Sequence, residues 1–459
     1  MDAIKSSNDY INELVKKART AQAEFENATQ EKVDEAVKVI AKVVYDNAEM
    51  LAEMAVEETG LGNYPDKVAK NKGKSRVIWN NLKGKKSRGV LERDEATGIT
   101  KVAKPIGVVG AITPCTNPIV TPMSNAMFAL KCGNAIIVSP HPRAKKCSTK
   151  TVEMMRAELK KIGLNPDLIQ VISDPSIEAT NALMPMVDVV IATGGMGMVK
   201  AVYSSGKPAL GVGAGNVQVI LDRDVNYAEA VPKIVAGRSF DNGIICSGEQ
   251  TAICPAEKFD EIMDIFEKNH GYVVRDKEEV AKFRNVIFNE KGAMNPDALG
   301  QSAQKVAALA GVEIPEETKV IVLEADGFGM DDLLAKEKMC PCIAAYKYDS
   351  FEDGVAIAKA NLEREGKGHS VSIHSENVAD IEYAAEQLSA SRFVVNQVCA
   401  SSAGGSFNNG LAPTNTLGCG SWGNNSISEN LDYKHLMNVS RIAYFMKDNP
   451  VPTDEELWA

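Results

Sequence analysis

Apolar strands that alternate with helical stretches occupy most of the middle of this sequence. Between residues 108 and 191 we expect strands and helices in turn, at 108–112, 126–130, 135–138, 152–159, 169–172 and 187–191. Neighbouring parallel strands need a connection long enough to hold a helix, and these spacings provide it. A similar alternation runs from about residue 217 to residue 396. The pattern predicts an α/β fold with two doubly wound domains, which suits a chain of 459 residues.

The two ends of the chain carry different patterns. Apolar residues at helical spacing predict two amphipathic helices within residues 1–60, the second ended by Gly60. Two β-like runs between Val90 and Val102 flank an Ala-Thr-Gly turn, which is typical of a hairpin. Residues 439–445 also have strand character, and we expect them to pair with this hairpin.

Composition excludes several classes of partner. The formal net charge of -10 argues against a nucleic-acid surface, which needs clustered Lys and Arg. We find no apolar stretch of the roughly 18–20 residues that span a bilayer, and no apolar core of a signal peptide.

The nine cysteines show no paired spacing along the sequence, which indicates reduced thiols in a cytoplasm. Cys340 and Cys342 form C-x-C with no nearby His, so we expect no metal site.

One cysteine stands out by its surroundings. Cys246 follows an apolar pair and precedes Ser-Gly, where a thiol can sit at a turn and face a cleft. Asn117 follows the strand at 108–112, in a loop position that lines ligand crevices in α/β folds. An Asn amide suits the oxyanion that forms when a thiolate attacks a carbonyl. The alternatives are an inert core cysteine and a turn-forming Asn.

Two glycine-rich loops are candidates for contact with a phosphate. Thr193, Gly194 and Gly195 follow a strand and open a helix, where backbone N–H groups and the helix dipole attract anions. This loop lacks the spaced G-x-G-x-x-G fingerprint. The second loop, at 211–216, leads into another strand, and a tight turn is its alternative interpretation.

Taken together, these motifs resemble those of the aldehyde dehydrogenase superfamily over essentially the whole chain. The similarity rests on the spacing of Asn117, Thr193–Gly195, the 211–216 loop, Cys246 and the Glu-x-x-x-Pro segment at Glu337. Three further segments, at 242–246, 404–409 and 419–423, are similar to the CoA-acylating branch. Within that branch they are most similar to the CoA-dependent succinate-semialdehyde dehydrogenases.

The resemblance implies a domain plan and an assembly. It implies a Rossmann-like cofactor domain, a catalytic domain and a small β oligomerisation element. Their expected residues are 1–88 with 105–216, then 217–430, and finally 89–104 with 431–459. We expect a homodimer or a dimer of dimers, because a projecting hairpin has unpaired edges.

The resemblance also implies a role for each motif. Cys246 would be the nucleophile, and its backbone N–H and the Asn117 amide would form the oxyanion hole. Glu337 would hold the nicotinamide ribose, and Thr193 to Gly195 would contact the pyrophosphate. His369, in Gly-Lys-Gly-His-Ser, resembles a segment of the acylating branch and would assist CoA; the alternative is a structural His.

A missing carboxylate predicts the fate of the thioester. Non-acylating members of the family carry a Glu that activates water in the loop matching 211–216, whereas Gly211 holds that position here. Without this base, attack by water loses a general-base contribution of roughly 10²–10⁴. A thiol ionises more readily than water, so we expect transfer to coenzyme A.

Local cations bear on the cofactor and on the aldehyde. His141 and Arg143 follow a strand where the family meets the adenosine ribose, which favours NADP over NAD. Lys70 and Lys74 share a helical face near the expected substrate entrance and would pair a substrate carboxylate, with Ser247 beside the nucleophile.

The predicted reaction is the interconversion of succinyl-CoA and succinate semialdehyde. The alternatives are an acetaldehyde or butyraldehyde enzyme with a neutral pocket, and a catalytically silent structural member of the family. Arg392 is an alternative carboxylate partner, and a solvated basic face is the alternative for each lysine.

Overall fold

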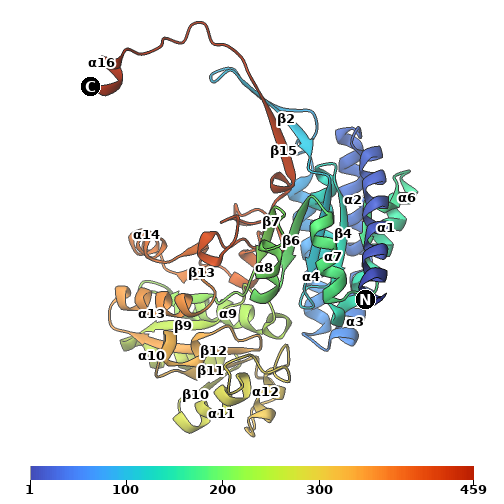
Figure 1. The fold of residues 1–459 in the computed structure, drawn as a ribbon. Coiled ribbons are helices and arrows are strands. Elements are labelled where there is room, and N and C mark those ends of the chain that lie inside the picture. The colour runs from blue at the N-terminus through green and yellow to red at the C-terminus, as the bar shows by residue number, and fades with distance from the viewer. Residues whose placement is uncertain (1) are drawn as a thin grey trace.

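The computed structural model describes residues 2–459 and has two parallel sheets, each covered by helices (Figure 1). The first sheet has the order β5-β4-β3-β6-β7. Its strands are β3 (Val108–Thr113), β4 (Ala135–Pro140), β5 (Ile169–Val171), β6 (Val189–Thr193) and β7 (Ala209–Val212). The chain order reverses between β3 and β6, and ligands bind α/β sheets at such a switch point.

Helices pack on both faces of this sheet. The N-terminal helices are α1 (Asp2–Phe25), α2 (Gln30–Asp46), α3 (Ala48–Thr59) and α4 (Tyr64–Leu82). The crossover helices are α5 (Val120–Lys131), α6 (Lys145–Lys161), α7 (Ile177–Leu183) and α8 (Met196–Tyr203). The prediction of two helices before Gly60 was wrong, because the chain leaves the helical conformation at Asn47 (φ -110°, ψ 21°) and starts again as α3.

The second sheet has seven parallel strands in the order β10-β11-β12-β9-β8-β13-β14. They are β8 (Gln218–Leu221), β9 (Thr251–Pro255), β10 (Gly271–Val274), β11 (Val320–Glu324), β12 (Cys342–Tyr348), β13 (Gly368–His374) and β14 (Ala390–Val395). Consecutive residues of β8 pack into different hydrophobic cores, Val219 on one face of the sheet and Ile220 on the other. Both faces are therefore buried, as in doubly wound folds.

Helices of the second half supply those two layers. They are α9 (Tyr227–Ser239), α10 (Phe259–Lys268), α11 (Lys277–Ile287), α12 (Ala303–Leu309), α13 (Phe351–Arg364), α14 (Val378–Gln387) and the short α15 (Cys399–Ser402). Across the described chain, no helix combines the length and apolar character needed to cross a membrane. The predicted α/β fold with two doubly wound halves is confirmed.

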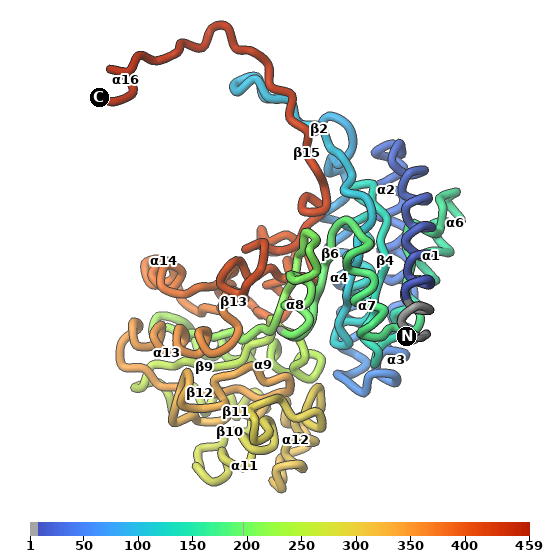
Figure 2. Tube along the Cα trace, in the orientation of Figure 1, coloured from blue at the N-terminus to red at the C-terminus, as the bar shows by residue number. Residues whose placement is uncertain are grey.

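A small antiparallel sheet stands apart from the two halves. The hairpin of β1 (Val90–Asp94) and β2 (Ile99–Pro105) pairs with β15 (Met437–Ala443) from the far end of the sequence, which confirms the predicted pairing. Figure 2 shows the chain continuing beyond β15 as an extended arm that ends in α16 (Asp454–Trp458). Several apolar side chains of this arm are exposed, and Phe445 is 87% exposed.

Candidate active site

Two cavities meet at Cys246. One, of about 310 Å³, lies along α4 and is called the α4 cavity here. The other, of about 480 Å³, lies at the ends of β3, β4 and β6 and is called the switch-point cavity. Cys246, Asn117 and Asn415 line both. Cys246 and Asn117, which the sequence predicted to act together, therefore border the same two cavities.

A strained turn delivers Cys246 to this junction. After α9, three consecutive residues have positive φ: Asp241 (51°), Asn242 (52°) and Gly243 (71°). A Cβ on Gly243 would lie 2.7 Å from the carbonyl carbon of Cys340, so this position accepts only glycine without a shift. Strained backbone of this kind persists where the surrounding structure holds it in place, and it is frequent at functional sites.

The surroundings of the Cys246 thiol favour its protonated form. Burial, followed by the nearby Glu337 and Cys419 groups, raises the pKa of Cys246 to about 12. The loop after β7 closes over its backbone, since a Cβ on Gly215 would lie 1.9 Å from the Cys246 carbonyl oxygen. The Gly215 N–H donates to Glu337 Oε1 at 3.3 Å, which ties Glu337 to the nucleophile.

Tyr203 of α8 packs against Gly211, the position at which we expected the carboxylate to be missing. A Cβ on Gly211 would lie 2.9 Å from the Tyr203 ring. The Gly211 N–H also donates to the Tyr203 hydroxyl at 2.9 Å. A Glu side chain at Gly211 would require the Tyr203 ring to move.

The switch-point cavity brings together most of the predicted cofactor residues. Thr193, Gly194, Gly195, His141 and Glu337 all line it. A Cβ on Gly195 would meet nothing within 4 Å, so the start of α8 faces open space. Burial and the charge of a neighbouring carboxylate raise the pKa of Glu337 to about 8, and its side chain is mostly a neutral acid at pH 7.

Arg143 lies behind the wall of this cavity. Its Nη2 donates to the carbonyl of Thr59 at 2.8 Å. Its backbone N–H donates to His141 Nδ1 at 3.1 Å, and His141 is the one of the pair that reaches the wall. A guanidinium carries five donors, so the bond to Thr59 leaves Arg143 with further donors.

The α4 cavity is mostly apolar, with two lysines of α4 on its wall. Lys74 Nζ donates to the carbonyls of Gly404 (3.0 Å) and Thr414 (3.1 Å), and no described carboxylate pairs with it. Burial lowers the pKa of Lys74 to about 8. Ser247 also lines the cavity, and its Oγ donates to the Ala400 carbonyl at 3.1 Å.

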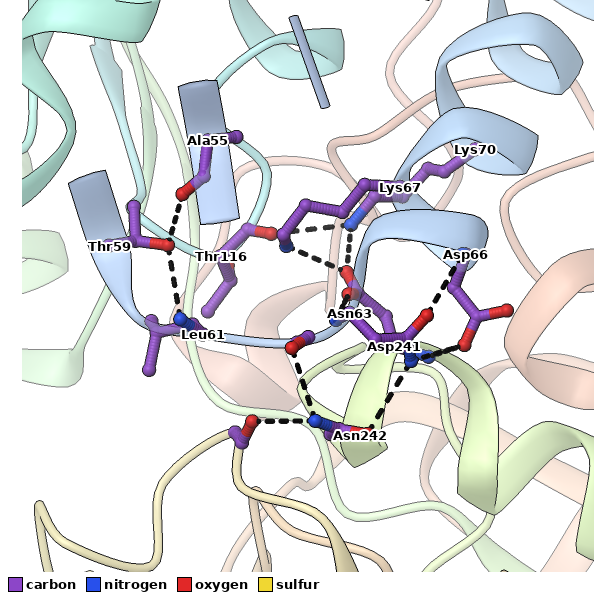
Figure 3. Close-up of polar contacts among 12 residues, drawn as sticks. Ala55, Thr59, Leu61, Asn63, Asp66, Lys67, Lys70, Thr116, Asp241 and Asn242 are labelled. Carbon is purple, nitrogen blue, oxygen red and sulfur yellow. Dashed lines mark hydrogen bonds and ion pairs between the residues drawn. The ribbon is translucent and has the colours of Figure 1, made fainter. Parts of the chain in front are cut away.

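Lys70 differs from Lys74 in its partners. Its ammonium contacts the buried carboxylate of Asp241, which also accepts from Lys67 at 3.1 Å (Figure 3). Lys70 therefore shares one carboxylate with Lys67, whereas Lys74 contacts only carbonyl dipoles.

His369 and Arg392 lie outside both cavity walls in the described chain. His369 is buried in β13 and neither ring nitrogen has a protein partner. Burial, followed by the charge of Arg392, lowers the pKa of His369 to about 3. Arg392 donates to Ser370 Oγ, Asn430 Oδ1 and the His369 carbonyl, so protein groups already occupy it.

Sequence reasoning missed two residues of the site. Asn415 lines both cavities, and its Nδ2 donates to the Val120 carbonyl at 3.0 Å. Its only sequence signal is a polar Thr-Asn-Thr run between two glycine-rich segments. Asp241 lies five residues before Cys246, but its partners on α4 are distant in sequence, and no local pattern indicates them.

Comparisons with known proteins identify the family of the chain. The model of the aldehyde dehydrogenase family matches residues 2–412. The chain is 56% identical over 448 residues to a succinate-semialdehyde dehydrogenase (acetylating) from Clostridium kluyveri, with 98% of each protein covered.

Solved structures of related enzymes share the whole fold. An acetylating aldehyde dehydrogenase from Geobacillus thermoglucosidasius has a TM-score of 0.94 at 36% identity, over 98% of this chain and 100% of that one. A propionaldehyde dehydrogenase from Rhodopseudomonas palustris, with bound CoA and an acylated cysteine, has a TM-score of 0.86 at 28% identity, over 95% and 97% of the two chains. The family model and these relatives span nearly the full sequence, and the chain belongs to the aldehyde dehydrogenase family.

Proposed function

We propose that the protein is a CoA-acylating aldehyde dehydrogenase that interconverts succinate semialdehyde and succinyl-CoA with NAD(P). One observation carries the choice of aldehyde: the Lys74 ammonium, which lacks a carboxylate partner in the described chain, lines the same cavity as Cys246. A substrate carboxylate that enters a mostly apolar cavity must be paired, and Lys74 offers that pair. The name of the Clostridium kluyveri relative, succinate-semialdehyde dehydrogenase (acetylating), supports the same aldehyde.

The chemistry follows from the junction of the two cavities. The Cys246 thiol releases its proton to solvent as its sulfur bonds to the aldehyde carbon, and the Asn117 amide with the Cys246 backbone N–H stabilises the oxyanion. NAD(P) supplies the hydride acceptor. The thiol of coenzyme A then gives up its proton as its sulfur bonds to the carbonyl carbon of the thioester; the bond to Cys246 breaks, and the Cys246 sulfur takes up a proton to return as the free thiol.

The residues of the switch-point cavity fit a dinucleotide. Open space above Gly195 at the start of α8 would admit a pyrophosphate, with Thr193 and Gly194 on the same cavity wall. Glu337 would bind the nicotinamide ribose close to the thiol. His141 lines this cavity, and the nearby Arg143 would add positive charge for a 2′-phosphate, which supports a preference for NADP over NAD.

The first test measures formation of the reduced cofactor from succinate semialdehyde and NADP, with and without CoA. We expect a signal that depends strictly on CoA and disappears in Cys246→Ala. Sustained turnover without CoA would mean that water hydrolyses the thioester, in conflict with the absent base at Gly211.

A second candidate, an enzyme for acetaldehyde or butyraldehyde, is favoured by the apolar part of the α4 cavity, which includes Val77, Ile245 and Leu417. Lys74→Ala separates the two. We expect kcat/KM for succinate semialdehyde to fall about 10²-fold or more, because a charged partner of a buried carboxylate is lost, with little change for acetaldehyde. Equal effects on both aldehydes would favour the second candidate.

Three further variants test the remaining predicted contacts. Ser247→Ala and Lys70→Ala, compared in the same way, test the other two predicted substrate contacts, and His369→Ala tests the predicted assistance to CoA.

We also propose the arrangement of the chain and its assembly. The cofactor domain would comprise residues 1–88 and 105–216, and the catalytic domain residues 217–430. Residues 89–104 and 431–459 would form the oligomerisation element of a homodimer or a dimer of dimers. The exposed apolar side chains of the arm support this role, and so do the free edges of the sheet formed by β1, β2 and β15. A cytoplasmic location remains our proposal, from the cysteine usage of the sequence.

A further inference from the structure

One ammonium group lies between the two loops that build the reaction centre. Lys70 Nζ contacts Asp241 Oδ2 and donates to the Thr116 carbonyl at 3.3 Å (Figure 3). Thr116 directly precedes Asn117, the proposed oxyanion donor. Asp241 opens the strained turn that leads to Cys246. The contacts of Lys70 therefore join the nucleophile loop, from the second half of the fold, to the oxyanion loop that follows β3.

Asp241 is a rigid attachment point for the nucleophile loop. Its Oδ1 accepts from the Asn63 N–H at 3.0 Å, and its own N–H donates to Asp66 Oδ2 at 2.7 Å. A Cβ on Gly62 would lie 1.8 Å from Asp241 Oδ1, so only glycine permits this approach. The strained turn is thus fixed to the start of α4 through several bonds.

The charges of this cluster are uneven. Burial alone would raise the pKa of Asp241, but the Lys70 and Lys67 ammonium groups hold it below its usual value. Lys67 is buried and contacts Asp241 directly, so it can balance that carboxylate without help. The second ammonium is not required for neutrality, and its additional bond goes to the oxyanion loop.

We propose that Lys70 is a positioning residue that sets the Cys246 thiol relative to the Asn117 amide, for any aldehyde that the enzyme uses. Displacement of a reacting group by about 1 Å can cost about 10²-fold in rate, so a bridge between these two loops affects the chemical step. This role goes beyond the proposed function, because it does not depend on the identity of the aldehyde.

The test compares three variants of lysines on α4. Lys70→Met leaves Asp241 paired with Lys67, so the fold is expected to persist; Lys70→Arg retains the charge and the donors. Lys72→Met is the matched control, since Lys72 pairs with the exposed Glu49 on the outer face of the same helix. Each variant is assayed with succinate semialdehyde and with acetaldehyde, and the alkylation of Cys246 by iodoacetamide is followed by mass spectrometry.

We expect kcat of Lys70→Met to fall about 10–100-fold for both aldehydes, with KM changed by less than about threefold. Lys70→Arg should recover part of the rate, and Lys72→Met should match the unmodified enzyme. Alkylation needs no oxyanion donor, so its rate at Cys246 should change by less than about threefold in all variants.

Three results would overturn the proposal. A loss confined to succinate semialdehyde would make Lys70 a substrate contact instead. A parallel loss of alkylation and of Tm would reduce its role to stability. An unchanged kcat would show that the bridge does not affect the reaction. The acetaldehyde arm keeps the test valid even if succinate semialdehyde is not a substrate.

Discussion

At the scale of single residues, two lysines of one helix differ in what they contact. Lys70 shares the Asp241 carboxylate with Lys67, whereas Lys74 faces only carbonyl oxygens, and burial lowers the pKa of Lys74 to about 8. The sequence placed both on one helical face but could not show this difference, because Asp241 is remote in the chain. The same limit explains why Cys246 and Asn117, which the resemblance to a family indicated, were predicted site residues, whereas Asp241 and Asn415 were not.

The lowered pKa of Lys74 predicts a pH dependence of substrate selectivity. The ammonium is present below about pH 8 and is lost above it, so the pairing of a substrate carboxylate weakens as the pH rises. We expect the ratio of kcat/KM for succinate semialdehyde to that for acetaldehyde to fall above about pH 8, approaching tenfold per pH unit. Taking the ratio cancels the ionisation of Cys246, which both aldehydes share. A ratio that stays constant up to pH 10 would argue against Lys74 as the carboxylate partner.

At the scale of elements, the turn between α9 and Cys246 concentrates strain in three residues. Gly243→Ala would place a residue with a side chain in a left-handed conformation, which costs about 1–2 kcal/mol. Its Cβ would also overpack against Cys340, which costs about 1–3 kcal/mol. We expect a loss of about 2–5 kcal/mol in the free energy of unfolding, measured by denaturant titration. Gly60→Ala is the matched control, because Gly60 has a similar φ of 66° and open space around its Cβ position. Equal losses in the two variants would mean that the contact with Cys340 adds nothing.

Elements were predictable wherever the pattern was local and periodic. The strands near residues 108, 135, 169 and 189 follow from apolar runs, and the hairpin from its turn residues. The end of α2 was missed, because the helical pattern of apolar residues continues through Asn47. The break is visible only in the backbone angles of Asn47 and in the hydrogen bond from its Nδ2 to the Val43 carbonyl. The register of β15 on β2, which pairs Val439 with Ala103, also required tertiary structure.

At the scale of the whole molecule, the arm beyond β15 offers its apolar side chains to solvent. Phe445 is 87% exposed and Tyr444 is 59% exposed, which is costly in an isolated chain. We expect Phe445→Asp to shift the protein towards the monomer in size-exclusion chromatography with light scattering. Asn449→Asp adds the same charge further along the arm and is expected to leave the mass unchanged. A wild-type monomer would contradict the proposed assembly.

The position of Lys70 and Lys74 one helical turn apart on α4 matters for anyone who wishes to redesign this enzyme. A library intended to accept new aldehydes would naturally randomise every side chain on the wall of the α4 cavity, including both lysines. If the bridge acts as proposed, variation at Lys74 alters selectivity, whereas variation at Lys70 lowers the rate for every substrate and hides useful combinations. The productive strategy is to hold Lys70 and Asp241 constant and to diversify around them.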